Sequence, residues 1–348
     1  MKKNRLLILT QTVDRNDPIL GFFHSWIIEF SKKYEFVTVI CLKKGEFDFP
    51  LNVKVLTLGK ESGVSKIKYI FNFFKYIIAE RKNYEKVFVH MNEEYVLLGG
   101  VIWRFLCKEV FLWRNHKLGS WKTQVAGFMA QKVFYTSSGS YTSKFKNSIK
   151  MPVGIDENLF RPVGNIERKQ HSFLYVGRIS EIKNVDIIIN AFTKLFSKNS
   201  TLDFTLNLVG PIDGDIDKKY TDALIETINK NNLTSKITFL DSVDHTKLPQ
   251  IYSAHRFCIN LTSSGSFDKT IWESAYCGCV PLVYNTSFLD ELPEGIRKEI
   301  GIQSLEIEDV ARMFEKCIVS CDVEQDTLVE IGKKHSLKLL MDNFSMYI

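Results

Sequence analysis

The chain has 348 residues, of which 45% are hydrophobic and 25% are charged, and its formal net charge is +6. A chain of this length usually divides into more than one hydrophobic core, and this composition excludes a disordered or fibrous protein. The charge suits phosphate-bearing ligands or an anionic membrane, but it is too small to indicate nucleic acid binding by itself.

Nothing in the sequence resembles a secretion signal or a membrane span. The apolar run near the start is only Leu6–Leu9, and polar Thr10 follows it. No uninterrupted apolar stretch approaches the roughly 20 residues that a spanning helix needs. The seven cysteines are odd in number and scattered, which favours reduced thiols over a disulfide framework. We therefore expect a cytoplasmic protein.

Strand and helix patterns alternate through the first half of the chain. Strands are predicted at residues 5–10, 35–41, 53–58, 86–91, 110–114 and 132–136. Helices are predicted at residues 19–32, 64–81, 94–105 and 121–131. Residues 151–170 then break the alternation with prolines, glycines and mixed charge, a pattern typical of a linker.

The alternation restarts directly after the linker. Strands are predicted at residues 172–176, 203–209, 236–240, 257–261 and 280–284. Helices are predicted at residues 184–196, 218–231, 246–253 and 270–276, and two or three more follow from residue 307. Such alternation predicts parallel sheets flanked by helices, so we expect an α/β protein with two Rossmann-like domains.

The first motif that indicates chemistry is FLYVGRISEIKN, residues 173–184. An apolar strand ends at Gly177, where the missing side chain lets a ligand approach the backbone. Arg178 and Lys183 follow before the next helix, and a guanidinium fork with an ammonium group suits a diphosphate. Ligands of open parallel sheets bind at this end of the strands. The alternative is a strand-to-helix turn with two solvated charges.

The second motif is SSGSFDKTIWESAYCGCVPLV, residues 263–283. A run of small polar residues follows a strand, and its backbone N–H groups and the next helix start can hold an anion. Asp268 or Thr270 is a candidate cap for that helix. Glu273 lies one turn inside it, where a carboxylate can accept hydrogen bonds from ribose hydroxyls. The alternative is that Glu273 only interacts with the helix dipole.

Three segments together resemble the signature regions of the retaining family-four glycosyltransferases, which have the GT-B fold. They are VGRISEIKN, MPVGIDENLF and WESAYCGCVPLV. The resemblance covers nearly the whole chain in layout and implies two Rossmann-like domains that face each other across a cleft. It implies an acceptor-side domain at 1–160, a nucleotide-sugar-binding domain at 161–330, and a C-terminal helix at 331–348 that packs back on the first domain.

The resemblance also assigns donor-binding residues. It implies that Arg178 and Lys183 bind the donor diphosphate and that Glu273 binds the ribose. The family's other glutamate, which contacts the donor sugar, falls on Gly265, so the sequence departs from the pattern there. SGSFDK resembles a family variant whose main-chain amides, or the side chains of Ser266, Asp268 and Lys269, contact the sugar. The complete expected donor set is Gly21, Gly177, Arg178, Lys183, Gly265, Ser266, Phe267, Asp268, Lys269, Thr270 and Glu273.

The first half of the chain supplies further candidates. The resemblance implies that Gly21, in the loop after the first strand, reaches the donor phosphates, and that His116 faces the reacting sugar. His116, Arg178 and Lys183 are thus the expected catalytic residues. The acceptor-side candidates lie at or after the ends of strands 5–10, 86–91 and 110–114. For Asp14 and Arg15 the alternative is a solvated surface loop, and for a lone histidine it is a structural or solvent-facing position. They are Asp14, Arg15, His90, Asn92 and Lys117.

These residues predict a hexosyltransferase-type enzyme that moves a sugar from a nucleotide diphosphate to a glycan or lipid-linked acceptor. The resemblance alone implies retention of configuration and a role in polysaccharide, lipopolysaccharide or glycolipid synthesis. We expect no cofactor and no metal, because DGDID at 213–217 should lie in a surface loop. An epimerase or phosphorylase of the same architecture lacks support in the sequence. A non-catalytic nucleotide-sugar sensor is the main alternative, favoured by the missing glutamate at Gly265.

The predicted helix at 64–81 carries two nonpolar stripes. One contains Ile67, Ile70, Phe71, Phe74, Ile77 and Ile78. The other contains Tyr69, Phe73 and Tyr76, beside Lys66, Lys68 and Lys75. A soluble helix needs only the first stripe, so the second suits contact with a bilayer, which would place the protein at the inner face of the plasma membrane. The alternative is that both stripes are buried.

Overall fold

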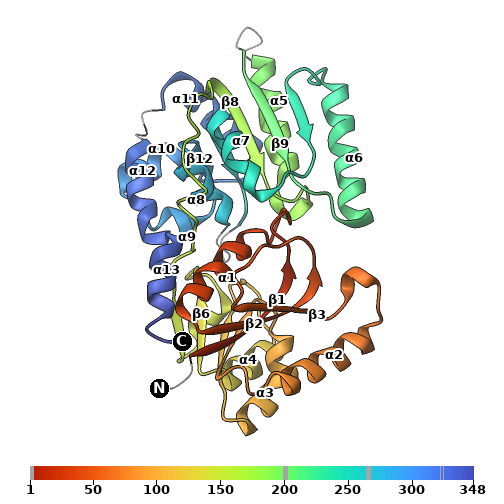
Figure 1. Cartoon of the computed structure of the whole chain (residues 1–348). Coiled ribbons are helices and arrows are strands. Elements are labelled where there is room, and N and C mark those ends of the chain that lie inside the picture. The colour runs from red at the N-terminus through yellow and green to blue at the C-terminus, as the bar shows by residue number, and fades with distance from the viewer. Residues whose placement is uncertain (1–3, 199–202, 264–267, 322, 324) are drawn as a thin grey trace. The chain divides into compact units, whose positions relative to one another are not determined.

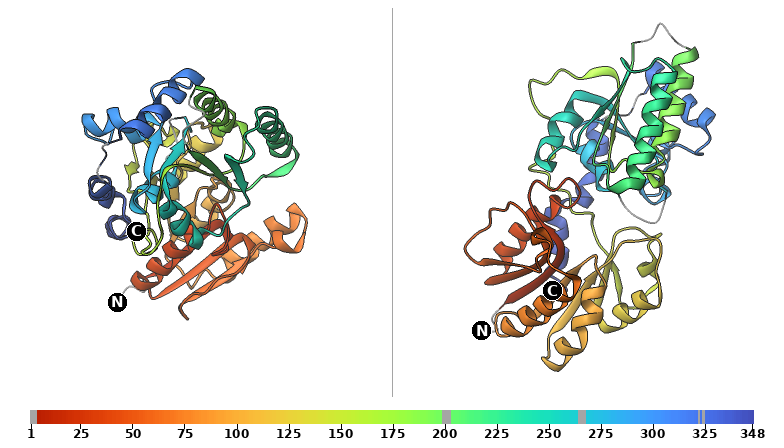
Figure 2. Two further views of the ribbon diagram at one scale, coloured as in Figure 1. Left: turned by 90° about the horizontal axis from the view of Figure 1, so that it is seen from above. Right: turned by 90° about the vertical axis from the view of Figure 1, so that its right-hand side faces the viewer.

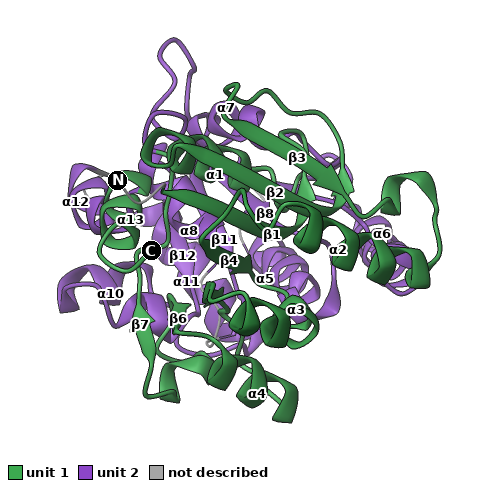
Figure 3. Ribbon diagram, turned by 60° about the horizontal axis from the view of Figure 1, so that its bottom comes forward, with its two compact units in different colours: residues 1–156, 337–348 green, residues 157–336 purple. Residues whose placement is uncertain are grey.

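The computed structural model describes residues 4–198, 203–263, 268–321, 323 and 325–348. The chain divides into two compact units (Figure 3). Unit 1 comprises Met1–Asp156 and Leu337–Ile348, and unit 2 comprises Glu157–Ser336. The division at Asp156 falls inside the expected linker, and the chain returns to unit 1 at Leu337 rather than at residue 331.

Unit 1 is built on a seven-stranded sheet in the order β3-β2-β1-β4-β5-β6-β7, and all neighbouring strands are parallel (Figure 1). The strands are β1 Arg5–Val13, β2 Phe36–Lys44, β3 Val53–Thr57, β4 Lys86–His90, β5 Glu109–Trp113, β6 Lys132–Tyr135 and β7 Ser148–Lys150. The helices are α1 Phe22–Lys33, η1 Lys60–Ser62, α2 Lys66–Ala79, α3 Glu94–Phe105, α4 Trp121–Met129, η2 Tyr141–Lys144 and α13 Leu337–Phe344.

Helices cover both faces of this sheet, because successive side chains of β1 are apolar and point to opposite faces. Leu6 and Ile8 point into one buried cluster, which also contains side chains of α1 and α13. Leu7 and Leu9 point into the other, with side chains of α2, α3 and α4. Because successive strand residues face opposite sides, a continuous apolar run is what a doubly covered strand needs.

Helix α13 completes the first of these clusters. The ring of Phe344 contacts the rings of Trp26, Phe30, Phe88, Trp113 and Phe134. The Leu337 N–H donates to the Ile155 carbonyl at 2.7 Å. This hydrogen bond joins the start of the C-terminal segment of unit 1 to the end of its N-terminal segment. The C-terminal segment is therefore part of the core of unit 1.

Unit 2, which is drawn mostly in green to blue in Figure 2, is built on a five-stranded parallel sheet. Its strand order is β10-β9-β8-β11-β12. The strands are β8 Lys169–Val176, β9 Thr205–Val209, β10 Ile237–Leu240, β11 His255–Asn260 and β12 Val280–Val283. The longer helices are α5 Val185–Lys198, α6 Gly214–Lys230, α7 Leu248–Ala254, α8 Lys269–Tyr276, α10 Glu294–Ile300, α11 Ile307–Val319 and α12 Gln325–Gly332. The short ones are η3 Glu181–Lys183, η4 His245–Lys247, α9 Thr286–Leu289 and η5 Lys333–His335.

The structure corrects three expectations from the sequence. Strand β7 was not predicted. Residues 213–217 do not form a surface loop, because Asp213 is the N-cap of α6 and Asp215 and Asp217 lie in its first turn. In α2 the stripe expected to be buried is only partly so: Phe74 and Ile77 pack on the core, but Ile67, Ile70, Phe71 and Ile78 are exposed. Tyr69, Phe73 and Tyr76 of the other stripe pack on the core.

Candidate functional site

The carboxyl ends of β8 and β9 meet at two glycines in unit 2. Gly177 has φ of 156° and Gly210 has φ of 152°. A Cβ on Gly210 would lie 1.9 Å from the carbonyl oxygen of Gly177, so any side chain there would clash with the neighbouring strand end. The Gly177 N–H donates to the Val209 carbonyl at 2.9 Å. Glycine at both positions therefore lets the two strand ends pack closely against each other.

Lys183 lies beside this edge and belongs to a hydrogen-bond network centred on the Asp268 carboxylate. Its Nζ is 2.7 Å from Oδ2 of Asp268 and 3.2 Å from Oγ1 of Thr262. The same Asp268 oxygen accepts hydrogen bonds from Thr262 Oγ1 at 2.7 Å and from Asn260 Nδ2 at 3.0 Å. Among the described residues, no hydrogen-bond donor reaches the other oxygen, Oδ1.

This network fixes the charge of Asp268. Burial alone would raise the pKa of its carboxyl, but the Lys183 charge and the hydrogen bonds outweigh burial and hold the pKa below its ordinary value. Asp268 occupies the N-cap position of α8, yet its side chain makes no cap hydrogen bond there. Asp268 therefore has the expected N-cap position, but its carboxylate pairs with Lys183 and does not accept a hydrogen bond from the helix N-terminus. Thr270 instead accepts a hydrogen bond from Asn260 at 3.3 Å.

Arg178 also has an acidic neighbour. Its Nε is 3.6 Å from Oδ2 of Asp217, in the first turn of α6, and its side chain is partly exposed. The hydroxyl of Tyr175 donates to the Arg178 carbonyl at 2.8 Å and so fixes the backbone at the end of β8. Both cations of the first motif are therefore positioned at one edge of one sheet, each beside a carboxylate.

Glu273 is buried in the second turn of α8, with 3% of its surface exposed. Its Oε1 lies 3.1 Å from Nε2 of His245, and the edge of the Phe160 ring packs against His245. Among the described residues, no hydrogen bond reaches its Oε2. The Glu273 carboxylate is thus oriented by His245.

His245 was missed by the sequence analysis. It lies in η4, a few residues after β10, so its place after the carboxyl end of a strand was the signal that could have identified it. Lys269 is the first residue of α8, one turn before Glu273. Burial lowers the pKa of Lys269 to about 7, and the Glu273 charge opposes part of that shift. Gly265, Ser266 and Phe267 lie outside the described residues.

In unit 1, His116 lies on an exposed loop after β5. Its Nδ1 is 3.0 Å from both the N–H and the carbonyl oxygen of Leu118, so Nε2 is the outward nitrogen. A buried ion pair between Arg114 Nε and Glu93 lies beneath this loop. Arg114 also donates to the Leu118 carbonyl at 3.1 Å, and Thr123 donates to Glu93 at 3.1 Å. The loop that carries His116 is therefore anchored.

His90, one of the acceptor-side candidates, is buried at the end of β4. Its ring is 1% exposed and stacks on Phe23 with a centroid distance of 4.0 Å. Its Nδ1 is 3.1 Å from the hydroxyl of Thr10. Asn92, two residues on, is half-buried, and its N–H donates to the His90 carbonyl at 2.9 Å.

The other candidates in unit 1 lie in surface loops. Gly21 is buried as the N-cap of α1, and its N–H donates to the Asp17 carbonyl at 2.9 Å. Asp14 accepts a hydrogen bond from the Asn16 N–H at 3.0 Å, within its own turn. Arg15 lies 3.5 Å from Glu46. Lys117 is exposed beside His116.

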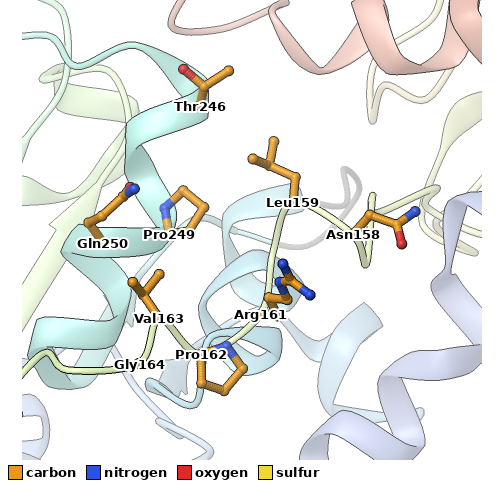
Figure 4. A pocket seen from close by; sticks show the side chains of 9 residues that line it. All are labelled: Asn158, Leu159, Arg161, Pro162, Val163, Gly164, Thr246, Pro249 and Gln250. Atoms are coloured by element: carbon orange, nitrogen blue, oxygen red, sulfur yellow. The ribbon is translucent and has the colours of Figure 1, made fainter.

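Unit 2 also has an open pocket of about 520 Å³, shown in Figure 4. The segment after the unit boundary forms one wall, and α7 with the preceding turn forms the other. None of the residues expected to bind the donor lines it. The lining residues are Asn158, Leu159, Arg161, Pro162, Val163, Gly164, Thr246, Pro249 and Gln250.

Comparison with known proteins identifies the second unit. Residues 156–314 match the family model described as glycosyl transferases group 1. The chain carries a group 1 glycosyltransferase domain. This match spans the edge that holds Arg178, Lys183, Asp268 and Glu273. No curated protein sequence matches the chain.

Solved glycosyltransferases share the fold of the whole chain. HepE from Anabaena, in complex with UDP and glucose, has 15% sequence identity and a TM-score of 0.76, covering 99% of each chain. Sucrose-phosphate synthase from Thermosynechococcus elongatus has 14% identity and a TM-score of 0.74, covering 99% of this chain and 98% of that one. WaaB, a lipopolysaccharide outer core galactosyltransferase, has 15% identity and a TM-score of 0.64, covering 98% of each. At these identities the likeness shows the fold, which is GT-B as expected.

Some of the residues predicted from the sequence lie together in unit 2. Lys183, Asp268 and Thr270 lie together through hydrogen bonds with Asn260 and Thr262. Among the described residues, no group of acidic, histidine and cysteine side chains has the arrangement of a metal site. No helix in the described ranges is long and apolar enough to cross a membrane.

Proposed function

We propose that the protein transfers a hexose from a nucleotide-diphosphate donor to a glycan or lipid-linked acceptor, with retention of configuration. The observation that carries this proposal is the edge of unit 2 where Arg178 and Lys183 lie at the carboxyl ends of parallel strands, in a domain of the glycosyltransferase group 1 family. This is where open α/β sheets bind nucleotides. HepE, which shares the fold, was solved with UDP and glucose.

The two cations would stabilise the leaving diphosphate. Cleaving the bond between sugar and diphosphate places new negative charge on the phosphate oxygens. Fixed cations act there without reorganisation, because Asp217 and Asp268 already hold Arg178 and Lys183 in place. We propose that this makes transfer independent of a divalent metal, since the cations supply the charge that a metal otherwise provides.

Glu273 would grip the nucleoside. With Oε1 engaged by His245, Oε2 can accept from a ribose hydroxyl, as acidic residues do in dinucleotide sites. The missing glutamate at Gly265 leaves the sugar to other groups, and Oδ1 of Asp268 is the described acceptor next to Lys183. In unit 1 we propose His116 as the group that meets the reacting sugar, with Nε2 outward.

We further propose that the reaction belongs to polysaccharide, lipopolysaccharide or glycolipid synthesis. The support is the shared fold of WaaB and WaaG, whose names place them in lipopolysaccharide synthesis. We propose that the protein is cytoplasmic and that a lipid-linked acceptor would bring it to the inner face of the plasma membrane.

Thermal-shift screening against a panel of nucleotide diphosphate sugars tests the donor site, because a bound donor raises the apparent stability by mass action. The expected result is a shift for one or a few donors, abolished in Lys183→Ala. A panel with no shift would contradict the proposal. A shift without turnover of any donor, in the presence of glycan and lipid acceptors, would favour the alternative of a nucleotide-sugar sensor, which the departure at Gly265 suggests.

A further inference from the structure

Helix α2 presents a nonpolar stripe to solvent in unit 1. Its inner side is buried through Phe73 and Ile77. Its outer side carries large apolar side chains at helical spacing, and Ile67 is 80% exposed. A surface helix ordinarily needs only one apolar stripe, so the outer one has no role in the core. It consists of Ile67, Ile70, Phe71 and Ile78.

The two following helices repeat this arrangement. Phe105 at the end of α3 is 84% exposed, and Phe128 in α4 is 88% exposed. Each belongs to an outer stripe with three- and four-residue spacing, which places its members on one side of the helix. These stripes are Leu98, Val101 and Phe105 in α3, and Trp121, Val125 and Phe128 in α4.

The three helices form one layer on the same side of the sheet (Figure 1). Phe73 of α2 packs on Tyr95 and Trp103 of α3, with ring centroids 5.7 and 6.0 Å apart. A Cβ on Gly100 of α3 would lie 2.4 Å from Cε of Met129 of α4, which shows how closely these two helices pack. The exposed stripes are therefore neighbours on a common surface, which we call the three-helix face.

The three-helix face is also basic. In the sequences of α2, α3 and α4, Glu94 is the one acidic residue. Nearby Glu80 is buried and pairs with Lys54 at 2.7 Å. Lys68 lies over the ring of Phe71, 5.2 Å from its centroid, so a cation and an exposed aromatic ring lie side by side. The exposed cations within the three helices are Lys66, Lys68, Lys75, Arg104 and Lys122.

We propose that the three-helix face docks on an anionic lipid bilayer, with its Phe, Trp and Ile side chains in the headgroup region and its cations against lipid phosphates. Amphipathic surfaces that lie in a membrane interface combine these residue types. Protein–protein interfaces are instead depleted in lysine. The loop that carries His116 and Lys117 leads directly into α4, so docking would bring that loop to lipid-linked acceptors, a step that does rest on the proposed function.

Flotation of the full-length protein with vesicles tests this proposal. Vesicles of phosphatidylcholine alone are compared with vesicles that contain phosphatidylglycerol. We expect binding to the anionic vesicles, weakened at high salt because screening shortens the reach of the lysine charges. The variant Phe71→Ser/Phe105→Ser/Phe128→Ser should bind at least about tenfold more weakly, since it removes exposed aromatic area and no core contact.

A charge variant and a matched control complete the test. Lys68→Glu/Lys75→Glu/Lys122→Glu should lose the preference for anionic lipid. Leu51→Ser/Val319→Ser removes exposed apolar side chains elsewhere and should bind as the wild type does. Thermal shift with nucleotide should be the same in all of these proteins, which separates this proposal from the donor site. Wild-type protein that ignores anionic vesicles would overturn the proposal. So would a wild-type dimer that the Phe variant makes monomeric without any vesicle binding.

Discussion

Replacing Glu273 by glutamine separates a nucleoside ligand from a structural carboxylate. In Glu273→Gln the amide oxygen can still accept from His245, whose Nε2 lies 3.1 Å from Oε1. The second oxygen becomes an NH₂ group, which cannot accept from a ribose hydroxyl. A hydrogen bond to a charged group contributes about 1.5–3 kcal/mol. The dissociation constant of a nucleoside diphosphate should therefore rise about 10- to 150-fold.

The assay is calorimetric titration of the nucleoside diphosphate into each protein, alongside melting curves. The chain supplies a matched control in a second buried Glu–His pair. Glu291 Oε2 lies 2.6 Å from His335 Nε2, and His335 packs on Trp272, the residue before Glu273 in α8. Glu291→Gln should change stability and leave the nucleotide affinity within about twofold. If Glu273→Gln behaves in the same way as this control, the carboxylate is structural and the reasoning is refuted.

Three further predictions concern the same edge of unit 2. Arg178→Ala and Lys183→Ala should each cost about 2–4 kcal/mol in transition-state stabilisation, a loss of about 30- to 1,000-fold in turnover, with an unchanged circular dichroism spectrum; near-wild-type turnover in either would remove that cation from the site. Transfer should continue in excess chelator, and its abolition with rescue by magnesium or manganese would point to residues 213–217. The pKa of Asp268 lies below its ordinary value of 3.8, so the ionised carboxylate stabilises the fold above that pH and ceases to do so as the pH falls through its lowered pKa. The melting temperatures of wild type and Asp268→Asn should thus differ at pH 7 and converge toward pH 3, and a constant difference would contradict this role.

The alternation of strands and helices was predictable because buried parallel strands require continuous apolar runs. The four apolar residues Leu6–Leu9 point alternately into the two buried clusters, so a strand that alternated apolar and polar residues would leave one face without apolar contacts. Strand β7 escaped prediction because Ser148–Lys150 is short, lies at the sheet edge and is only partly buried. The N-cap of α6 escaped because Asp213 and Gly214 resemble a turn until the helix that follows is seen.

The contents of the candidate site were less predictable than its place. The positions of Arg178 and Lys183 follow from strand ends, but their partners depend on side chains that meet only in three dimensions. The sequence predicts that the Asp268 side chain caps a helix. In the structure the carboxylate pairs with Lys183, which lies 85 positions away in the sequence. In α2, both stripes are nonpolar, so hydrophobicity alone did not tell which one the core would take.

The position of Phe344 in the core of unit 1 has a consequence for the order of folding. Synthesis runs from the N-terminus, so all of unit 2 leaves the ribosome before the segment Leu337–Ile348 does. Until then the sheet of unit 1 lacks the ring that fills the space among Trp26, Phe88 and Phe134. The unit whose translation begins first is thus completed only after unit 2, and a chain truncated before Leu337 would have a complete second unit and an open aromatic core in the first.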